Sequence, residues 1–154
     1  MARALNDRPE RTGRCLCGAV SFEATHVPAQ FGICHCRMCR HWTGSALFGV
    51  SVPKEHVRWT GAENIAEHVS SGWAKRGFCK SCGSNLYFQF TADGTYAEDT
   101  EIPLGLFDDP NGFSLRAEIY SDEAPDSYAI ADQGHKRVTR AGVIEILPIL
   151  ASED

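Results

Sequence analysis

Cys34-His35-Cys36-Arg37-Met38-Cys39 places three thiols within six consecutive residues. Two cysteine pairs lie on either side of it in the sequence, Cys15-Leu16-Cys17 and Cys79-Lys80-Ser81-Cys82, and these three clusters contain all seven cysteines of the chain. Sulfurs that converge on one point suit a soft metal ion in tetrahedral coordination. The spacing therefore predicts metal binding, with zinc as the expected ion.

Disulfide bonding and redox catalysis are the competing interpretations of these cysteines. Seven is an odd number, 154 residues is long for a disulfide-stapled mini-protein, and cysteines as close as Cys15 and Cys17 rarely meet disulfide geometry. The N-terminal sequence MARALNDRPERTGRC has no apolar segment of a secretory signal. A thioredoxin-like CxxC would open a helix, whereas SNLYFQF after Cys82 is typical of a strand. Metal binding is favoured over both.

Composition predicts one zinc domain over residues 13–150, preceded by a flexible arm over residues 1–12. Hydrophobic residues make up 43% of the chain and charged residues 23%, as in ordinary globular proteins. No apolar run reaches the roughly 20 residues of a membrane span, so we expect a cytoplasmic protein without a membrane partner. The net charge of -5 argues against nucleic acid as a partner. Basic residues near the cysteines either form a solvated surface or bind an anion: Arg37, Arg40, His41, Lys75, Arg76 and Lys80.

Short runs of strand-forming residues, separated by Gly, Pro, Asn and Asp, predict an all-β fold. We expect a sandwich or partly open barrel of short antiparallel strands. The expected strands are Ala19–Ala24, Ser45–Val52, Val57–Thr60, Ile65–Ser70, Asn85–Phe90, Pro103–Phe107 and Leu115–Tyr120, with Val143–Leu147 as a further edge strand. The best helical window, Ala97–Ile102, is short and acidic.

The cysteine pairs and the triplet predict two different metal sites. The two pairs together make a closed four-thiolate set, Cys15, Cys17, Cys79 and Cys82, which is typical of a structural zinc. The triplet Cys34, Cys36 and Cys39 then binds a second ion and leaves its fourth position to another ligand. His35, on an extended segment between two ligands, should point away from the metal. His41 could reach it, and a saturated Cys3His structural site is therefore the alternative.

An open site of three thiolates favours thiol chemistry. Zinc with three thiolates carries a net charge of -1 and activates water poorly, but coordination to a metal deprotonates a thiol outright. The predicted reaction is attack of a zinc-bound substrate thiolate on a small electrophile, or the reverse cleavage. Cys34, Cys36 and Cys39 would act in catalysis through the zinc that they carry.

The cysteine motifs and their flanking glycines resemble those of a known enzyme family. These stretches are Gly13-Arg14-Cys15-Leu16-Cys17-Gly18-Ala19-Val20, the Cys34–Cys39 triplet with Thr43-Gly44-Ser45-Ala46, and Phe78-Cys79-Lys80-Ser81-Cys82-Gly83-Ser84. In order and spacing they are similar to the glutathione-dependent formaldehyde-activating enzyme family, also called the GFA or centromere-protein-V domain family, over roughly residues 12–130. The resemblance implies an Mss4-like β fold with two zinc ions, the Cys34, Cys36, Cys39 ion being catalytic. It also implies a carbon–sulfur lyase activity that adds glutathione to formaldehyde to give S-(hydroxymethyl)glutathione.

The sequence departs from this family late in the domain. Glu118 stands where a histidine is usual, and Ala124-Pro125 is followed by Asp126-Ser127 without the usual tryptophan. We expect these departures to leave the metal chemistry unaffected and to bear on the identity of the substrate. A lyase acting on a small thiol and an aldehyde is the leading hypothesis. A non-catalytic zinc-stabilised binding module and a metal-responsive or redox-sensing protein are the alternatives.

Overall fold

The computed structural model describes residues 10–152, which divide into two compact units. The first unit contains residues 10–29 and 50–113, and the second contains residues 30–49 and 114–152. The predicted all-β class is confirmed: strands dominate both units and form two open sheets, and the described residues contain two short α-helices. The chain passes between the units three times, so neither unit is a continuous segment of sequence.

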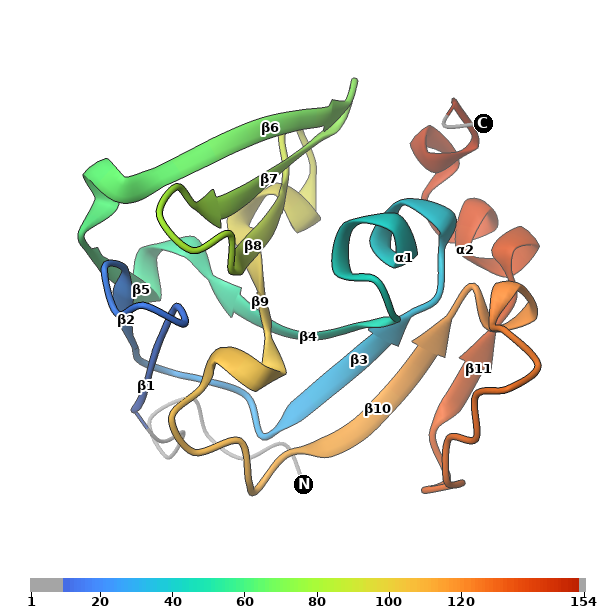
Figure 1. Cartoon of the computed structure of the whole chain (residues 1–154). Coiled ribbons are helices and arrows are strands. Elements are labelled where there is room, and N and C mark those ends of the chain that lie inside the picture. The colour runs from blue at the N-terminus through green and yellow to red at the C-terminus, as the bar shows by residue number, and fades with distance from the viewer. Residues whose placement is uncertain (1–9, 153–154) are drawn as a thin grey trace. The chain divides into compact units, whose positions relative to one another are not determined.

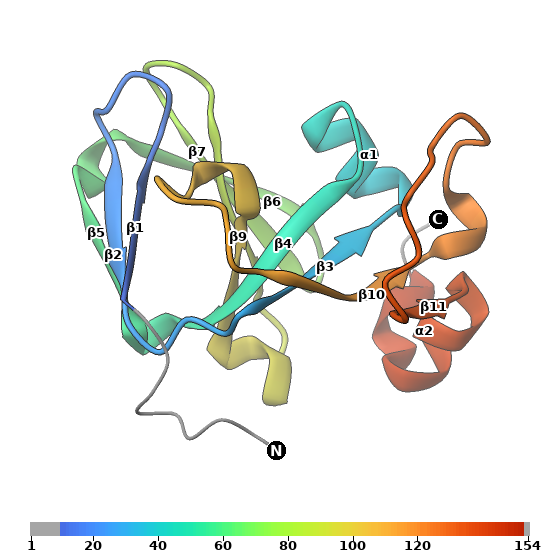
Figure 2. The same ribbon diagram turned by 90° about the horizontal axis from the view of Figure 1, so that it is seen from below.

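The first unit contains a small three-stranded sheet and one side of the larger sheet. The small sheet has the order β1-β2-β5 with antiparallel pairs, in which Phe22 lies opposite Trp59, and the three strands lie side by side in Figure 2. Its strands are β1 (Arg11–Arg14), β2 (Ser21–Ala24) and β5 (Val57–Thr60). The larger sheet continues in the order β4-β9-β8-β7-β6. Its strands here are β4 (Leu47–Pro53), β6 (Ile65–Ser71), β7 (Ala74–Cys79), β8 (Asn85–Phe90) and β9 (Asp99–Pro103).

The core of the first unit is built around two of its cysteines. Cys15, Cys79 and Leu86 are almost completely buried and pack with Val20 and Tyr87. This arrangement makes the cysteine positions part of the hydrophobic core, so that their geometry is set by packing as well as by the backbone.

A glycine makes room for one of these core side chains. A Cβ atom at Gly77, on β7, would stand 2.4 Å from the Tyr87 ring on β8. Residues with a side chain are therefore excluded from this position by the aromatic ring.

The second unit contains the other side of the larger sheet, in the order β11-β10-β3-β4. Its remaining strands are β3 (Gln30–Cys34), β10 (Ser114–Ile119) and β11 (Lys136–Val138), and its helices are α1 (Arg37–Thr43) and α2 (Arg140–Ile146). Figure 1 shows β3, β10 and β11 side by side, with α1 following β3. A cluster of Ile33, Ala46 and Leu115 forms the apolar core here, with Tyr128 and Ile130 packed against it.

Several predicted elements differ from those in the structure. The strands are not all antiparallel, because β10 pairs in parallel with both β3 and β11. The segment Val143–Leu147 was expected as an edge strand, but its first four residues end α2, whose N-cap Thr139 accepts a hydrogen bond from the backbone N–H of Gly142 at 3.3 Å. A side-chain cap of this kind favours helix over strand.

Two further segments were misplaced along the chain. The expected helical window Ala97–Ile102 contains the end of a 3-10 turn, Thr95–Glu98, and most of β9. The expected strand Pro103–Phe107 is mostly a second 3-10 turn, Leu104–Leu106, because β9 ends at Pro103. Proline removes a backbone donor at the end of the ladder.

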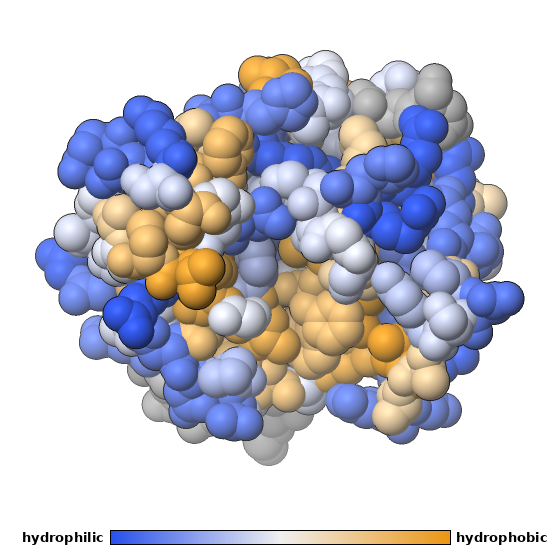
Figure 3. Space-filling model, viewed as in Figure 1, coloured by the Kyte–Doolittle hydropathy of each residue, from blue (hydrophilic) through white to orange (hydrophobic). Residues whose placement is uncertain are grey.

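The predicted domain boundaries remain a prediction. Arg11 and Thr12 of the expected flexible arm belong to β1, while residues 1–9 lie outside the described part of the chain. Among the described residues, no helix is long and apolar enough to cross a membrane. The face drawn in Figure 3 carries both hydrophilic and hydrophobic residues.

Three strands of the first unit are joined by a polar contact whose strength depends on pH. Lys75 Nζ and the Tyr87 hydroxyl both donate to Glu67 Oε1, at 2.7 and 2.6 Å. The hydrogen bond from Lys75, followed by that from Tyr87, lowers the pKa of Glu67 below its ordinary value. A carboxylate with a lowered pKa stabilises the folded state above the pKa of the unfolded chain, about 4.3, and this contribution is lost as pH falls through the lower folded value.

We therefore expect Glu67→Gln to lower the free energy of unfolding by about 0.5–1 kcal/mol at pH 7, a modest effect because the carboxylate is partly screened by solvent. The difference from wild type should shrink as pH is lowered below the pKa of the unfolded chain, about 4.3, and urea denaturation at a series of pH values measures it. In a Lys75→Met background the substitution should cost less at pH 7. A cost that does not change with pH would contradict the assigned contact.

Candidate metal centres

The sulfur atoms of Cys15, Cys17, Cys79 and Cys82 all lie within 4.8 Å of one another. Cys15 Sγ is 3.6 Å from Cys17 Sγ, and Cys17 Sγ is 3.9 Å from Cys79 Sγ. Four thiolates around a tetrahedral zinc, with Zn–S bonds of about 2.3 Å, have sulfurs about 3.8 Å apart. The donor set and its spacing therefore fit zinc. We call this group the four-cysteine cluster.

Two backbone turns of similar form present these sulfurs. In the first turn, the N–H of Gly18 donates to the carbonyl of Cys15 at 3.2 Å; in the second, the N–H of Gly83 donates to that of Cys79 at 2.8 Å. Both glycines have positive φ, 80° and 77°. The N–H of Val20 also donates to Cys15 Sγ at 3.3 Å. Each turn aims two thiols at one point, as the CxC and CxxC spacings predict.

The thiols of this cluster cannot all ionise easily without a cation. The Ser84 hydroxyl and backbone lower the pKa of Cys82 to about 5. A backbone hydrogen bond from Ala19 favours the thiolate of Cys17, but the neighbouring sulfur of Cys15 and burial outweigh it and raise the pKa of Cys17 to about 11. One thiolate thus forms readily while another is opposed by its neighbours. A dication at their centre removes this repulsion.

Cys34, Cys36 and Cys39 form a second cluster in the other unit, again with all sulfurs within 4.8 Å of one another. Cys34 is the last residue of β3, Cys36 is the N-cap of α1, and Cys39 lies in the first turn of α1. Cys36 Sγ accepts a hydrogen bond from the backbone N–H of Cys39 at 3.4 Å. The sulfurs of Cys36 and then of Cys39 raise the pKa of Cys34 well above its ordinary value. We call this group the three-cysteine cluster; its donors also fit a soft cation.

Tyr120 and Glu123 respond to the charge of the three-cysteine cluster. Burial first, then the charges of Cys36 and Cys34, raise the pKa of Tyr120 to about 12. Burial and the charge of Cys36 also raise the pKa of Glu123. The charge of Arg140, whose Nε lies 3.5 Å from Glu123 Oε1, acts in the opposite direction and lowers this pKa. Tyr120 has a positive φ of 51°, which is rare for a residue with a side chain. This conformation ends β10 and turns the chain into the short 3-10 segment Ser121–Glu123.

His41, the alternative fourth ligand, does not join the three-cysteine cluster, and His35 points away from it as expected. Among the described residues, no further His, Cys, Asp or Glu joins the three sulfurs within 4.8 Å. His35 is fully buried, and its Nε2 lies 3.1 Å from Glu118 Oε2. All seven cysteines are free thiols, which agrees with the interpretation against disulfides. The metal ligands themselves remain a prediction.

The basic residues near the last cysteine pair are engaged elsewhere in their own unit. Lys75 pairs with Glu67, Arg76 is buried with its guanidinium 4.9 Å from the Phe88 ring centroid, and Lys80 Nζ donates to the carbonyl oxygen of Glu63 at 2.8 Å. Arg37, on α1 beside the three-cysteine cluster, is exposed.

Sequence reasoning missed three residues around the three-cysteine cluster: Tyr120, Glu123 and Arg140. They lie about 80 to 100 positions from Cys39 in the sequence, and their neighbours have no metal-ligand spacing. One usable signal existed in the strand-forming run Leu115–Tyr120, which carries two charges: Arg116, which is exposed, and Glu118, which is buried. A buried charge within such a run indicates a buried partner.

Comparisons with known proteins place these clusters in context. The profile of the glutathione-dependent formaldehyde-activating enzyme family matches residues 10–123, which include all seven cysteines. A Schizosaccharomyces pombe protein named as an uncharacterized lyase is 32% identical over 126 residues, covering 81% of this chain and 88% of the relative. A crystal structure of a Rhodobacter sphaeroides protein is similar in fold, with a TM-score of 0.53 and 22% identity, and the match covers 83% of this chain and 99% of that chain.

The turn of the second cysteine pair depends on the positive φ of Gly83. We expect Gly83→Ala to lower the free energy of unfolding by about 1–2 kcal/mol, because a Cβ atom disfavours the left-handed conformation. Gly72→Ala is the matched control: Gly72 lies in an exposed turn of the same unit, with open space around an added Cβ and no positive φ. Denaturant titration of both variants compares them. Equal small effects would show that the turn tolerates a side chain.

Proposed function

The chain belongs to the glutathione-dependent formaldehyde-activating enzyme family, and on this premise we propose that it is a zinc-dependent carbon–sulfur lyase that joins a small thiol to a small aldehyde. Glutathione and formaldehyde are the proposed pair. The lyase name of the Schizosaccharomyces pombe relative supports the reaction class.

The observation that carries this proposal is the unequal number of thiols in the two clusters. Four thiols complete a tetrahedral zinc site, whereas three described ligands in the other cluster leave one coordination position for a substrate. We therefore assign a structural zinc to the four-cysteine cluster and a catalytic zinc to the three-cysteine cluster.

The proposed reaction balances without an oxidant or reductant. A bond forms between the thiol sulfur and the aldehyde carbon, the C=O double bond becomes a single bond, and the thiol proton ends on the aldehyde oxygen. A zinc ion held by three thiolates supplies the acidification of the substrate thiol. The backbone of β3 and α1 fixes the three cysteines, and the exposed guanidinium of Arg37 offers its charge to an acidic thiol.

The first expected consequence is that the protein holds two zinc ions with unequal strength. The ligands of the four-cysteine cluster come from segments more than sixty residues apart, and Cys15 and Cys79 pack in the core, so the loss of the cluster should prevent folding. We expect Cys79→Ser to be insoluble or unfolded, while Cys36→Ser folds, retains one zinc per chain and loses about 100-fold or more in activity. Metal analysis and circular dichroism measure these outcomes. Unfolding of Cys36→Ser as complete as that of Cys79→Ser would contradict the division into structural and catalytic sites.

Thiol binding at the three-cysteine cluster is the second expected consequence. In cobalt-substituted protein, a fourth thiolate strengthens the sulfur-to-metal charge-transfer absorption. Glutathione should raise this band in wild type and leave it unchanged in Cys39→Ser, because that variant lacks an intact cluster. Absorption spectroscopy during titration gives the affinity.

The matched ligand and variant controls separate charge recognition from simple coordination. 2-Mercaptoethanol should bind more weakly than glutathione, and Arg37→Ala should reduce this preference by several-fold. A spectrum already typical of four protein ligands and indifferent to every thiol would contradict the lyase and favour the non-catalytic binding module.

A further inference from the structure

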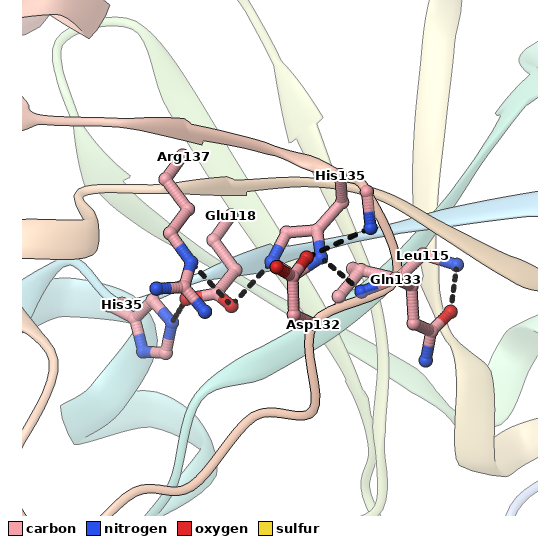
Figure 4. A network of polar contacts seen from close by, with 8 residues as sticks. His35, Leu115, Glu118, Asp132, Gln133, His135 and Arg137 are labelled. Carbon is pink, nitrogen blue, oxygen red and sulfur yellow. Dashed lines mark hydrogen bonds and ion pairs between the residues drawn. The ribbon is translucent and has the colours of Figure 1, made fainter.

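A buried carboxylate lies between two histidines next to the three-cysteine cluster. Glu118 on β10 is 4% exposed. Its Oε2 lies 3.1 Å from His35 Nε2, and its Oε1 lies 2.8 Å from His135 Nε2 and 3.9 Å from Arg137 Nε. Figure 4 shows the two imidazole rings converging on the carboxylate from different segments. Both histidine side chains are fully buried.

His35 connects this network to the cysteines. It lies between Cys34 and Cys36, and alternate side chains of an extended segment point to opposite sides. A His35 ring that is held toward Glu118 therefore directs the two neighbouring thiols to the other side, where they can meet Cys39. The backbone N–H of His35 donates to the carbonyl of Ile119 at 3.1 Å, a second attachment to β10.

The orientation of the His35 ring depends on Glu118. Its other ring nitrogen, Nδ1, is buried without a hydrogen-bond partner among the described residues. The remaining neighbour of note is the Tyr128 ring, whose centroid lies 6.0 Å away. Within residues 10–152, the Glu118 carboxylate is thus the one polar side-chain contact that fixes the imidazole.

His135 holds the carboxylate from the opposite side. Its Nδ1 accepts a hydrogen bond from the backbone N–H of Gln133 at 3.3 Å, so that Nε2 carries the proton given to Glu118. The Gln133 side chain in turn accepts from the backbone N–H of Leu115 at 3.2 Å. His135 lies beyond residues 10–123, the part matched by the family profile.

We propose that Glu118 is a positioning residue for the metal-binding loop: clamped by His135, it fixes His35 and thereby aims Cys34 and Cys36 at a common metal ion. The inference rests on the proposed function, because it concerns the metal of the three-cysteine cluster. It also gives a different role to Glu118, which stands where a histidine is usual in the family. The residue at this position then affects metal retention rather than substrate identity. Partners that orient metal-binding groups typically contribute 10- to 100-fold in affinity.

The test compares two kinds of substitution in β10, one that removes the carboxylate and one that removes apolar packing. Glu118→Ala removes the clamp, while Leu115→Ala removes a buried apolar side chain from the same strand and keeps the backbone N–H that contacts Gln133. In Glu118→Gln, the amide offers one acceptor oxygen to two N–H donors and keeps only one of the two hydrogen bonds. The measurement is the rate at which a coloured chelator removes zinc from each folded, zinc-loaded variant, together with its melting temperature. The zinc of the three-cysteine cluster is the one absent from Cys36→Ser.

We expect Glu118→Ala to speed zinc release from the three-cysteine cluster about tenfold or more, Glu118→Gln to have an intermediate effect, and Leu115→Ala to lower the melting temperature without speeding release. The cobalt absorption bands should shift in the Glu118 variants alone. If Glu118→Ala does not fold, Glu118→Gln and His135→Gln decide by the same comparison.

Equal rates of release in Glu118→Ala and Leu115→Ala, at a matched loss of melting temperature, would show that the carboxylate has only a structural role. This outcome in a protein that holds two zinc ions overturns the positioning role and leaves the proposed function standing. A wild-type chain that holds one zinc overturns both.

Discussion

Repulsion between sulfur atoms is the constraint around which this protein is organised. Seven thiols are gathered into two groups in which every sulfur lies within 4.8 Å of the others of its group. The pKa of Cys17 and that of Cys34 are raised because neighbouring thiolates oppose a further negative charge. Such crowding is costly unless a cation is shared among the sulfurs. The turns, caps and core contacts around each group hold the thiols in this arrangement.

The two groups answer this constraint by different means. In the four-cysteine cluster, the sulfurs come from two separate turns, and one cysteine of each turn, Cys15 or Cys79, is packed in the hydrophobic core. In the three-cysteine cluster, one short segment supplies all the sulfurs. Glu118 on the neighbouring strand β10 and Tyr120, just after that strand, belong to its surroundings. The arrangement of the four-cysteine cluster favours a permanently held set of ligands. The arrangement of the three-cysteine cluster leaves its ligands close to polar groups.

Local patterns in the sequence were enough to predict several strands and the cysteine groups, because both depend on residues that are near neighbours. The strands β1, β3, β7 and β11 were not predicted. The strands Val57–Thr60 and Asn85–Phe90 follow from runs of strand formers between turn residues. The parallel pairing of β3 with β10 could not be predicted, since nothing near Cys34 specifies a partner about 80 residues away. The contact of Glu118 with His35, 83 positions away, was out of reach for the same reason, and nothing near Glu118 specifies His135 as its second partner. The helix α2 was missed because a cap at Thr139 outweighed the β-branched residues that follow it.

The pairing of β3 with β10 also means that the three cysteines are synthesised well before the strand that pairs with their own. His35 and Glu118 are 83 positions apart, and a ribosome adds roughly 5–20 residues each second. Cys34, Cys36 and Cys39 therefore emerge on the order of ten seconds before the strand that will support them. During this interval their proximity depends on covalent spacing and on the nearby elements α1 and β4, without β10. A thiol cluster contained in six consecutive residues can form early on the nascent chain. The four-cysteine cluster cannot form until Cys82 has been synthesised.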